Sequence, residues 1–192
     1  MKKIKILVSI IILSSSQVLI CQQKANANEE EAFLQQIESS NNSLPLITNL
    51  DFQNIAKIQQ TGNNNYVSID QTLIGTNIPA NIAELIQNGD VNNAILFQNG
   101  SGNSHFINQT GNGNMLEASV IGDNNSSTID QFGNNNIINQ DLVGNDMAFI
   151  LSQIGSGNEI NQVEIDYNPR QYQVQQLGNG MKIMIINGGV IP

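Results

Sequence analysis

Apolar residues occupy every second position in short runs along most of the chain, and Gly, Asn, Asp or Ser separate the runs. Ala83 and Leu85 form such a pair in one run, and Ala94 and Leu96 form a pair in the next. A period of two is the pattern of a β-strand with one buried face, and residues that tolerate positive φ mark the turns between strands. The pattern therefore predicts short strands joined by tight turns.

The tripeptide Gln-x-Gly recurs at nearly constant spacing and defines a repeat. Its glycines, which we expect to be turn residues, are Gly62, Gly89, Gly111, Gly133, Gly155 and Gly178. Successive glycines are 27, 22, 22, 22 and 23 residues apart, and further glycines halfway between the central ones divide each unit into two arms. Units of this length that stack on one another predict an all-β protein, a β-solenoid of six 22-residue strand-turn-strand repeats that form two facing parallel sheets.

Asn and Gln keep phase with these glycines, on the same face of each arm as the apolar pairs. The in-phase amides are Asn54, Gln60, Asn65, Asn81, Gln87, Asn92, Gln98, Asn103, Gln109, Asn114, Asn125, Gln131, Asn136, Gln153, Asn158 and Gln176. Stacking places each amide beside its copies above and below, and amides hydrogen-bond along such a column. We therefore expect structural amide ladders that hold the coils in register. A disordered tract is the alternative for an amide-rich composition, but disorder gives no reason for positions to keep phase.

The first residues differ from the repeats and indicate export. A basic stretch precedes an apolar run at residues 6–20, and Ala25 and Ala27 place small residues where a signal peptidase reads the chain. We therefore expect residues 1–27 to be a signal peptide and the mature protein to be secreted. A lipoprotein is the alternative, because Cys21 follows the apolar run, but the bulky Ile20 stands where a lipidation site needs a small residue.

The mature chain that this cleavage leaves is strongly acidic. It keeps three basic residues against all 16 acidic ones, a net charge of −13, and it has no cysteine. A polyanion is not attracted to the negatively charged phosphates of nucleic acid, so we expect no nucleic acid partner. Because disulfides are absent, a small exported domain needs another source of stability, which the amide ladders supply.

The repeats contain no arrangement of residues that predicts catalysis. His105 is the only histidine of the chain and occupies an inward position, where we expect it to pack in a column. A metal cluster of His and Cys, or a His-based triad, needs at least one more such residue. We therefore expect no enzyme, with no catalytic residue, no metal site, no cofactor and no small-molecule substrate.

The repeat unit Asn-x5-Gln-x-Gly-x2-Asn-x-Ala-x3-Gln resembles the curlin repeat. The copy from Asn81 to Gln98 matches every position of that pattern, and the resemblance extends over residues 53–187. It implies a subunit of curli-type functional amyloid fibres, which assembles with itself and with other curlin subunits at the bacterial cell surface and supports adhesion and biofilm formation. It also implies partners among the outer-membrane curli secretion and assembly proteins.

Two segments lie outside the repeats: a leader at residues 28–52 and a short tail at residues 188–192. In curlins the corresponding leader is a recognition segment for the secretion apparatus, and a flexible leader without a role is the alternative. Phe33, Leu34 and Ile37 form an apolar stripe in the leader, which predicts a short helix.

Later copies of the repeat depart from the pattern. The closing Gln of the unit is replaced by Val120, Leu142, Glu164 and Asn187. The final copy also has Arg170 in place of the leading amide, and Met181 and Lys182 follow its turn. A deviant final repeat is typical of the minor, nucleating curlin subunit, so the resemblance favours the nucleator, with these three residues as a candidate surface-anchoring final repeat.

The alternatives are the major curlin subunit and, in a different class, a non-polymerising secreted β-solenoid adhesin. The last arm, at residues 181–186, is apolar and has no cap, and an open strand edge favours polymerisation.

Overall fold

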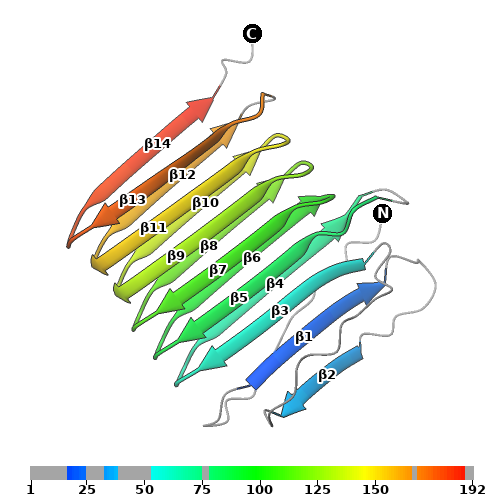
Figure 1. The fold of residues 1–192 in the computed structure, drawn as a ribbon, viewed down its shortest axis with the longest axis horizontal. Coiled ribbons are helices and arrows are strands. Elements are labelled where there is room, and N and C mark those ends of the chain that lie inside the picture. Colours follow the sequence, from blue (N-terminus) through cyan, green and yellow to red (C-terminus); the bar gives the residue numbers. More distant parts are fainter. Residues whose placement is uncertain (1–16, 25–32, 39–52, 75–77, 166–167, 189–192) are drawn as a thin grey trace.

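The computed structural model describes residues 17–24, 33–38, 53–74, 78–165 and 168–188, and all regular structure in these ranges is β-strand. Each repeat contributes two strands joined by a tight turn (Figure 1). The repeat strands are β3 Gln53–Thr61, β4 Tyr66–Leu73, β5 Ile82–Asn88, β6 Asn93–Gly100, β7 Ser104–Thr110, β8 Met115–Ile121, β9 Ser126–Asn134, β10 Ile137–Val143, β11 Ala148–Ser156, β12 Glu159–Ile165, β13 Gln171–Leu177 and β14 Lys182–Gly188. Within the described ranges, no helix is long and apolar enough to cross a membrane.

The strands form two sheets, one built from the first arms of the repeats and one from the second arms. The order in the first sheet is β13-β11-β9-β7-β5-β3-β1-β2, and the order in the second is β14-β12-β10-β8-β6-β4. Each repeat strand pairs in parallel with the equivalent strand of the next repeat. We number the coils from one (β3 and β4) to six (β13 and β14). The expected fold class is confirmed, because the two parallel sheets stack as a β-solenoid.

Two further strands, β1 Gln17–Lys24 and β2 Phe33–Glu38, extend the first sheet beyond coil one, and both pair antiparallel (Figure 1). The expectation of six strands in each sheet is therefore wrong for this sheet, which has eight. The short helix expected around Phe33 and Ile37 is also wrong, since β2 covers these residues. An isolated helix of one or two turns has little stability, whereas an open sheet edge offers backbone partners.

The boundaries of the N-terminal segments rest on the sequence alone. Strand β1 lies within the expected signal peptide, and β2 lies within the expected leader. Residues 1–16, 25–32, 39–52 and 189–192 lie outside the described residues. The signal peptide, the secretion-recognition role of residues 28–52 and the tail therefore stay predictions.

A thin core separates the two sheets. Inward side chains of neighbouring coils stack in register, so that Leu85 pairs with Ile58 in one sheet and Leu96 pairs with Ile69 in the other. All four side chains are at most 1% exposed. Full burial of such a side chain stabilises a fold by about 1.5–3 kcal/mol, so each added coil brings its own share of the hydrophobic stabilisation.

The turn glycines allow the coils to approach closely. All six Gln-x-Gly glycines have φ between 107° and 134°. A Cβ at Gly111 would lie 2.0 Å from the carbonyl oxygen of Gly133 in the next coil, whereas at Gly178 the nearest atom is 3.5 Å away and belongs to the side chain of Met181. In the central coils glycine is thus required because the next coil leaves no room for a Cβ. In coil six that space is free, and only the positive φ favours glycine.

Candidate functional site

The turn between the two arms of each coil carries a glutamine column and an asparagine column. We call this side of the solenoid the uniform corner, and its residues are Gln60, Gln87, Gln109, Gln131, Gln153, Gln176, Asn65, Asn92, Asn114, Asn136 and Asn158. Each glutamine Nε2 donates to the Oε1 of the glutamine in the next coil, at 2.6–3.0 Å. The column is therefore continuous from coil one to coil six, and every donor points toward coil six.

The glutamines also bond to the opposite sheet. Besides its bond to Gln131, Gln109 Nε2 donates to the backbone oxygen of Asn93 at 3.0 Å. Gln131 donates in the same way to the backbone oxygen of Met115 at 3.0 Å. Both amide protons are thus satisfied although the side chains are fully buried. Removing one such partner leaves a buried polar group unpaired, which costs about 1–3 kcal/mol.

The asparagine column bonds to the backbone as well as along itself. Asn114 Nδ2 donates to Asn92 Oδ1 at 3.1 Å and to the carbonyl oxygen of Gly133 at 2.8 Å. Asn114 Oδ1 in turn accepts from the backbone nitrogen of Asn136 at 3.1 Å. The sequence pattern indicated the amide partners, but it contained no signal for the glycine carbonyl as acceptor.

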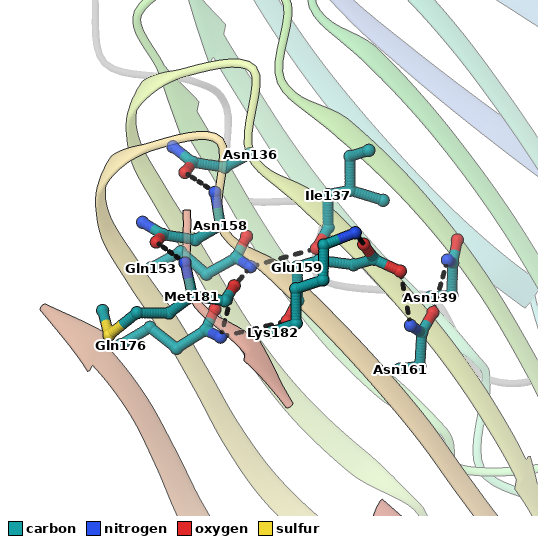
Figure 2. A network of polar contacts seen from close by, with 10 residues as sticks. All are labelled: Asn136, Ile137, Asn139, Gln153, Asn158, Glu159, Asn161, Gln176, Met181 and Lys182. Atoms are coloured by element: carbon teal, nitrogen blue, oxygen red, sulfur yellow. Dashed lines mark hydrogen bonds and ion pairs between the residues drawn. The ribbon is translucent and has the colours of Figure 1, made fainter. Parts of the chain in front are cut away.

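Figure 2 shows how these columns end in coil six. Gln153 Nε2 donates to Gln176 Oε1 at 2.8 Å, and Gln176 Nε2 donates to the backbone oxygen of Met181 at 3.0 Å. In the asparagine column, the backbone nitrogen of Met181 donates to Asn158 Oδ1 at 3.1 Å. Met181 brings no side-chain amide to the next position, so the asparagine column stops at Asn158 while the glutamine column continues through the last coil.

The other side of the solenoid carries two columns of mixed chemistry, and we call it the variable corner. Its leading residues are Asn54, Asn81, Asn103, Asn125, Met147 and Arg170, and its closing residues are Gln71, Gln98, Val120, Leu142, Glu164 and Asn187. The leading column resembles the uniform corner as far as coil four, because Asn103 Nδ2 donates to Asn81 Oδ1 at 3.0 Å and Asn125 Nδ2 donates to Asn103 Oδ1 at 3.1 Å. In coils five and six the leading position has no amide, because Met147 and Arg170 stand there.

His105 ends the short glutamine column of the variable corner. Gln71 Nε2 donates to Gln98 Oε1 at 2.6 Å, and Gln98 Nε2 lies 2.7 Å from His105 Nδ1. Because the amide nitrogen is the donor, Nδ1 accepts and the proton of the neutral ring is on Nε2, which has no partner among the described residues. Burial lowers the pKa of His105 to about 4. The ring is therefore a neutral member of the column.

An apolar cluster spans coils three to five at this corner and replaces the amides of the closing column in coils three and four and of the leading column in coil five. Val120, Leu142, Met147 and Phe149 are at most 2% exposed and pack together. Tyr172 of coil six packs against the cluster, with its ring centroid 4.6 Å from that of Phe149. At these coil junctions apolar packing is thus added to the remaining hydrogen bonds of the leading column, such as that from Met147 N to Asn125 Oδ1.

A buried carboxylate joins coils five and six at the variable corner. The side chain of Glu164 is 0% exposed. Its Oε1 accepts hydrogen bonds from the hydroxyl of Tyr172 and from Asn187 Nδ2, the latter at 2.8 Å, and Arg170 Nε lies 3.9 Å from its Oε2. Burial and the hydrogen bond to Glu164 raise the pKa of Tyr172, so the phenol stays a donor. The sequence marked Glu164 and Arg170 as departures from the repeat but did not predict their contact.

The three residues of the candidate surface-anchoring repeat do not form one patch. Arg170 precedes β13 at the variable corner, whereas Met181 and Lys182 follow the turn at the uniform corner. Lys182 Nζ pairs with Glu159 Oε2 of coil five at 2.7 Å (Figure 2). Both cations of coil six therefore contact carboxylates of coil five. Nowhere among the described residues do three or more His, Cys, Asp or Glu side chains gather as around a metal ion.

Comparison with known proteins identifies one segment of the solenoid. Residues 79–111, which include coil two and the first arm of coil three, match the family model described as the curlin associated repeat. No curated protein and no solved structure matches the chain. Together with the solenoid fold, the repeat match favours a structural role over an enzymatic one. Residues 79–111 of the solenoid are therefore similar to the curlin associated repeat.

Proposed function

We propose that the chain is a subunit of an extracellular curli-type amyloid fibre at the bacterial cell surface, with a role in adhesion and biofilm formation. The observation that carries the proposal is the open last coil. Among the described strands, β13 and β14 have a neighbour on one side only. Their inward side chains Val174, Ile183 and Ile185 are half-buried, while the equivalent residues of central coils are fully buried. An open strand edge with apolar side chains recruits further strands.

Coil one of a second copy fits this open end. Stacking in register would place Gln60 of the second copy beside Gln176, so the glutamine column would continue from one copy to the next. It would also place the small Ala56 beside the large ring of Tyr172. In the full chain, β1 pairs with β3 along this edge of coil one. Cleavage after Ala27 would remove β1 and leave the edge free, which supports an order in which secretion precedes assembly.

The proposal gives the chain two kinds of partner. Other curlin subunits would bind through the open coil. The outer-membrane curli secretion and assembly proteins would recognise the chain during export, with residues 28–52 as the candidate recognition segment. The net charge of −13 expected for the mature chain supports the absence of a nucleic acid partner.

The fibre proposal is tested with the purified mature chain, residues 28–192. We expect thioflavin fluorescence to rise with time, electron microscopy to show unbranched fibres and X-ray diffraction to give a meridional reflection at about 4.7 Å. A chain that remains monomeric for days at high concentration would contradict the proposal and favour the secreted adhesin.

Within this function we propose the role of the minor, nucleating subunit. Coil six has no amide at the leading position, where Arg170 stands, or after its turn, where Met181 stands, so it offers a less regular template than the coils before it. We expect deletion of residues 171–192 to release the protein from cells while its seeding of a major subunit is largely retained. For a major subunit, the same deletion would damage fibre elongation and leave surface attachment unchanged. Fractionation of cells and medium, together with a seeding assay, distinguishes the two roles.

A further inference from the structure

The two corners of the solenoid differ in how much they distinguish one coil from another. At the uniform corner, all five junctions between coils have the same glutamine-to-glutamine bond. A coil displaced by one repeat would find an identical glutamine acceptor there. The glutamine column therefore fixes the register of residues within a strand but does not specify which coil stacks on which.

At the variable corner the leading asparagines repeat as far as coil four, but the other contacts of each junction have their own chemistry. The first two junctions use Gln71 with Gln98 and Gln98 with His105. The next two belong to the apolar cluster, which joins Val120 to Leu142 and then Leu142 to Met147 and Phe149. The last junction joins the carboxylate of Glu164 to Arg170, Tyr172 and Asn187. No two of these five junctions place the same set of side chains in contact.

We propose that the variable corner specifies which coil stacks on which, and that Glu164 is the residue that selects coil six as the neighbour of coil five. This inference concerns stacking within one chain and does not depend on fibre formation. Coil two in the place of coil six would present Asn81, Ala83 and Gln98 to Glu164 and would bring no cation. A fully buried carboxylate without a cation or enough donors is strongly unfavourable, so the mismatch is rejected.

The opposite mismatch is unfavourable for the same reason. If coil six stacked on coil three, Arg170 and the hydroxyl of Tyr172 would face Val120, which is apolar and 0% exposed. The guanidinium would lose its ion pair with the carboxylate, and the phenol would lose the carboxylate oxygen that accepts its hydrogen bond. Coil six is therefore matched to coil five from both sides of the junction.

The test exchanges the chemistry of the last junction for that of the junction before it. Glu164→Leu alone removes the carboxylate, and R170M/Y172F alone removes the Arg and the Tyr hydroxyl that face it. The triple variant E164L/R170M/Y172F gives the last junction the same side-chain types as the junction before it, which is formed by Leu142, Met147 and Phe149. E159Q is the matched control, because Glu159 also pairs with a cation of coil six, Lys182, but at the exposed surface.

Hydrogen exchange of backbone amides in the full chain is the measurement, in whichever state the chain folds, monomer or assembly. The readout is the exchange rate of β13 and β14 relative to that of β7 and β8 in the same molecule. We expect each of the two partial variants to accelerate exchange in coil six by about tenfold or more and E159Q to stay within about threefold of the original chain. The triple variant also leaves Gln162 Nε2 without the Tyr172 hydroxyl that accepts from it, so we expect its acceleration to fall clearly below the combined effect of the two partial variants but not to vanish.

Two results would overturn the proposal. The first is additivity: if the accelerations of E164L and R170M/Y172F simply combined in the triple variant, Glu164 and its partners in coil six would not be matched to one another. Equal acceleration in coils three and six, or an effect of E159Q as large as that of E164L, would show that Glu164 has only a general stabilising role. Because exchange is read within one chain, these results are independent of whether the chain forms fibres.

Discussion

Coil three and coil six are built from the same repeat, yet their side chains have different surroundings. Coil three lies between two neighbours, so Ile107 and Leu116 are 0% exposed. Coil six has a neighbour on one side only, and its equivalent residues Val174 and Ile183 are half-buried. In a solenoid each repeat interacts with its nearest neighbours only. The same residue type therefore contributes more to stability in coil three than in coil six, and matched substitutions in the two coils measure the difference.

The largest expected difference concerns the turn glycines. We expect Gly111→Ala to destabilise the fold by about 5 kcal/mol or more, because the added Cβ would overlap the carbonyl oxygen of Gly133 and also adopt an unfavourable positive φ. Gly178→Ala meets only the flexible side chain of Met181, so it should cost about 1–3 kcal/mol from its positive φ alone. Urea denaturation of both variants measures the two losses, and equal losses would contradict the importance of close coil approach.

The amide columns give the second comparison. Replacing Gln109 and Asn114 together by Ala interrupts both columns of the uniform corner in coil three and leaves neighbouring buried amides unpaired, at about 1–3 kcal/mol for each residue. Gln176→Ala removes the last member of the glutamine column and leaves one neighbour, Gln153, without its acceptor partner. We therefore expect the central variant to slow fibre formation clearly and the terminal variant to slow it less. If thioflavin kinetics of the central variant matched those of the original chain, apolar packing alone would set the register.

Acid sensitivity gives the third and smallest comparison, because coil three contains His105 while coil six has Tyr172 at the equivalent position. Burial lowers the pKa of His105 in the folded chain to about 4, below the ordinary value of 6.5. The unfolded chain therefore binds this proton at higher pH than the folded chain does. Stability is unaffected by His105 above pH 6.5 and is lost as the pH falls from 6.5 to about 4, by about 3 kcal/mol in total.

His105→Gln tests this pH dependence, because a glutamine at this position keeps an acceptor for Gln98 without a titrating ring. We expect the loss of stability between pH 6.5 and 4 to be smaller in the variant than in the original chain by about 3 kcal/mol. Denaturant midpoints measured across this pH range give the comparison. An unchanged pH dependence would show that the acidic side chains, and not His105, determine the sensitivity to acid.

The sequence predicts the solenoid because two independent periods agree. The alternation of residues such as Ala94 and Leu96 indicates strands, and the recurring Gln-x-Gly indicates where the turns lie. The phase of the amides also places Gln87 and Gln109 at equivalent positions, and in the structure they are hydrogen-bonded. Features that repeat along the chain can thus be derived from the sequence.

Features that do not repeat could not be derived. Glu164, Tyr172 and Asn187 are separated by 8 and 15 residues, and each stands at a position where other coils have a different residue. Their contact follows from the register of coils five and six, which only the structure gives. The antiparallel pairing of β1 with β3 likewise has no periodic signal in the sequence.

The common direction of its hydrogen bonds gives the glutamine column an electrical polarity of its own, whereas the asparagine oxygens point the other way, as Asn114 Oδ1 does in accepting from Asn136. Every Nε2 in the column from Gln60 to Gln153 points toward coil six, and the shorter row of Gln71 and Gln98 runs the same way. A peptide amide has a dipole of about 3.5 D, and aligned dipoles add as they do along a helix axis. The carbonyl end of each row, at coil one, is therefore negative, and the amide end is positive. Two copies that met through the same end would bring like poles of their glutamine rows together, whereas copies that met through unlike ends would extend a single aligned glutamine row.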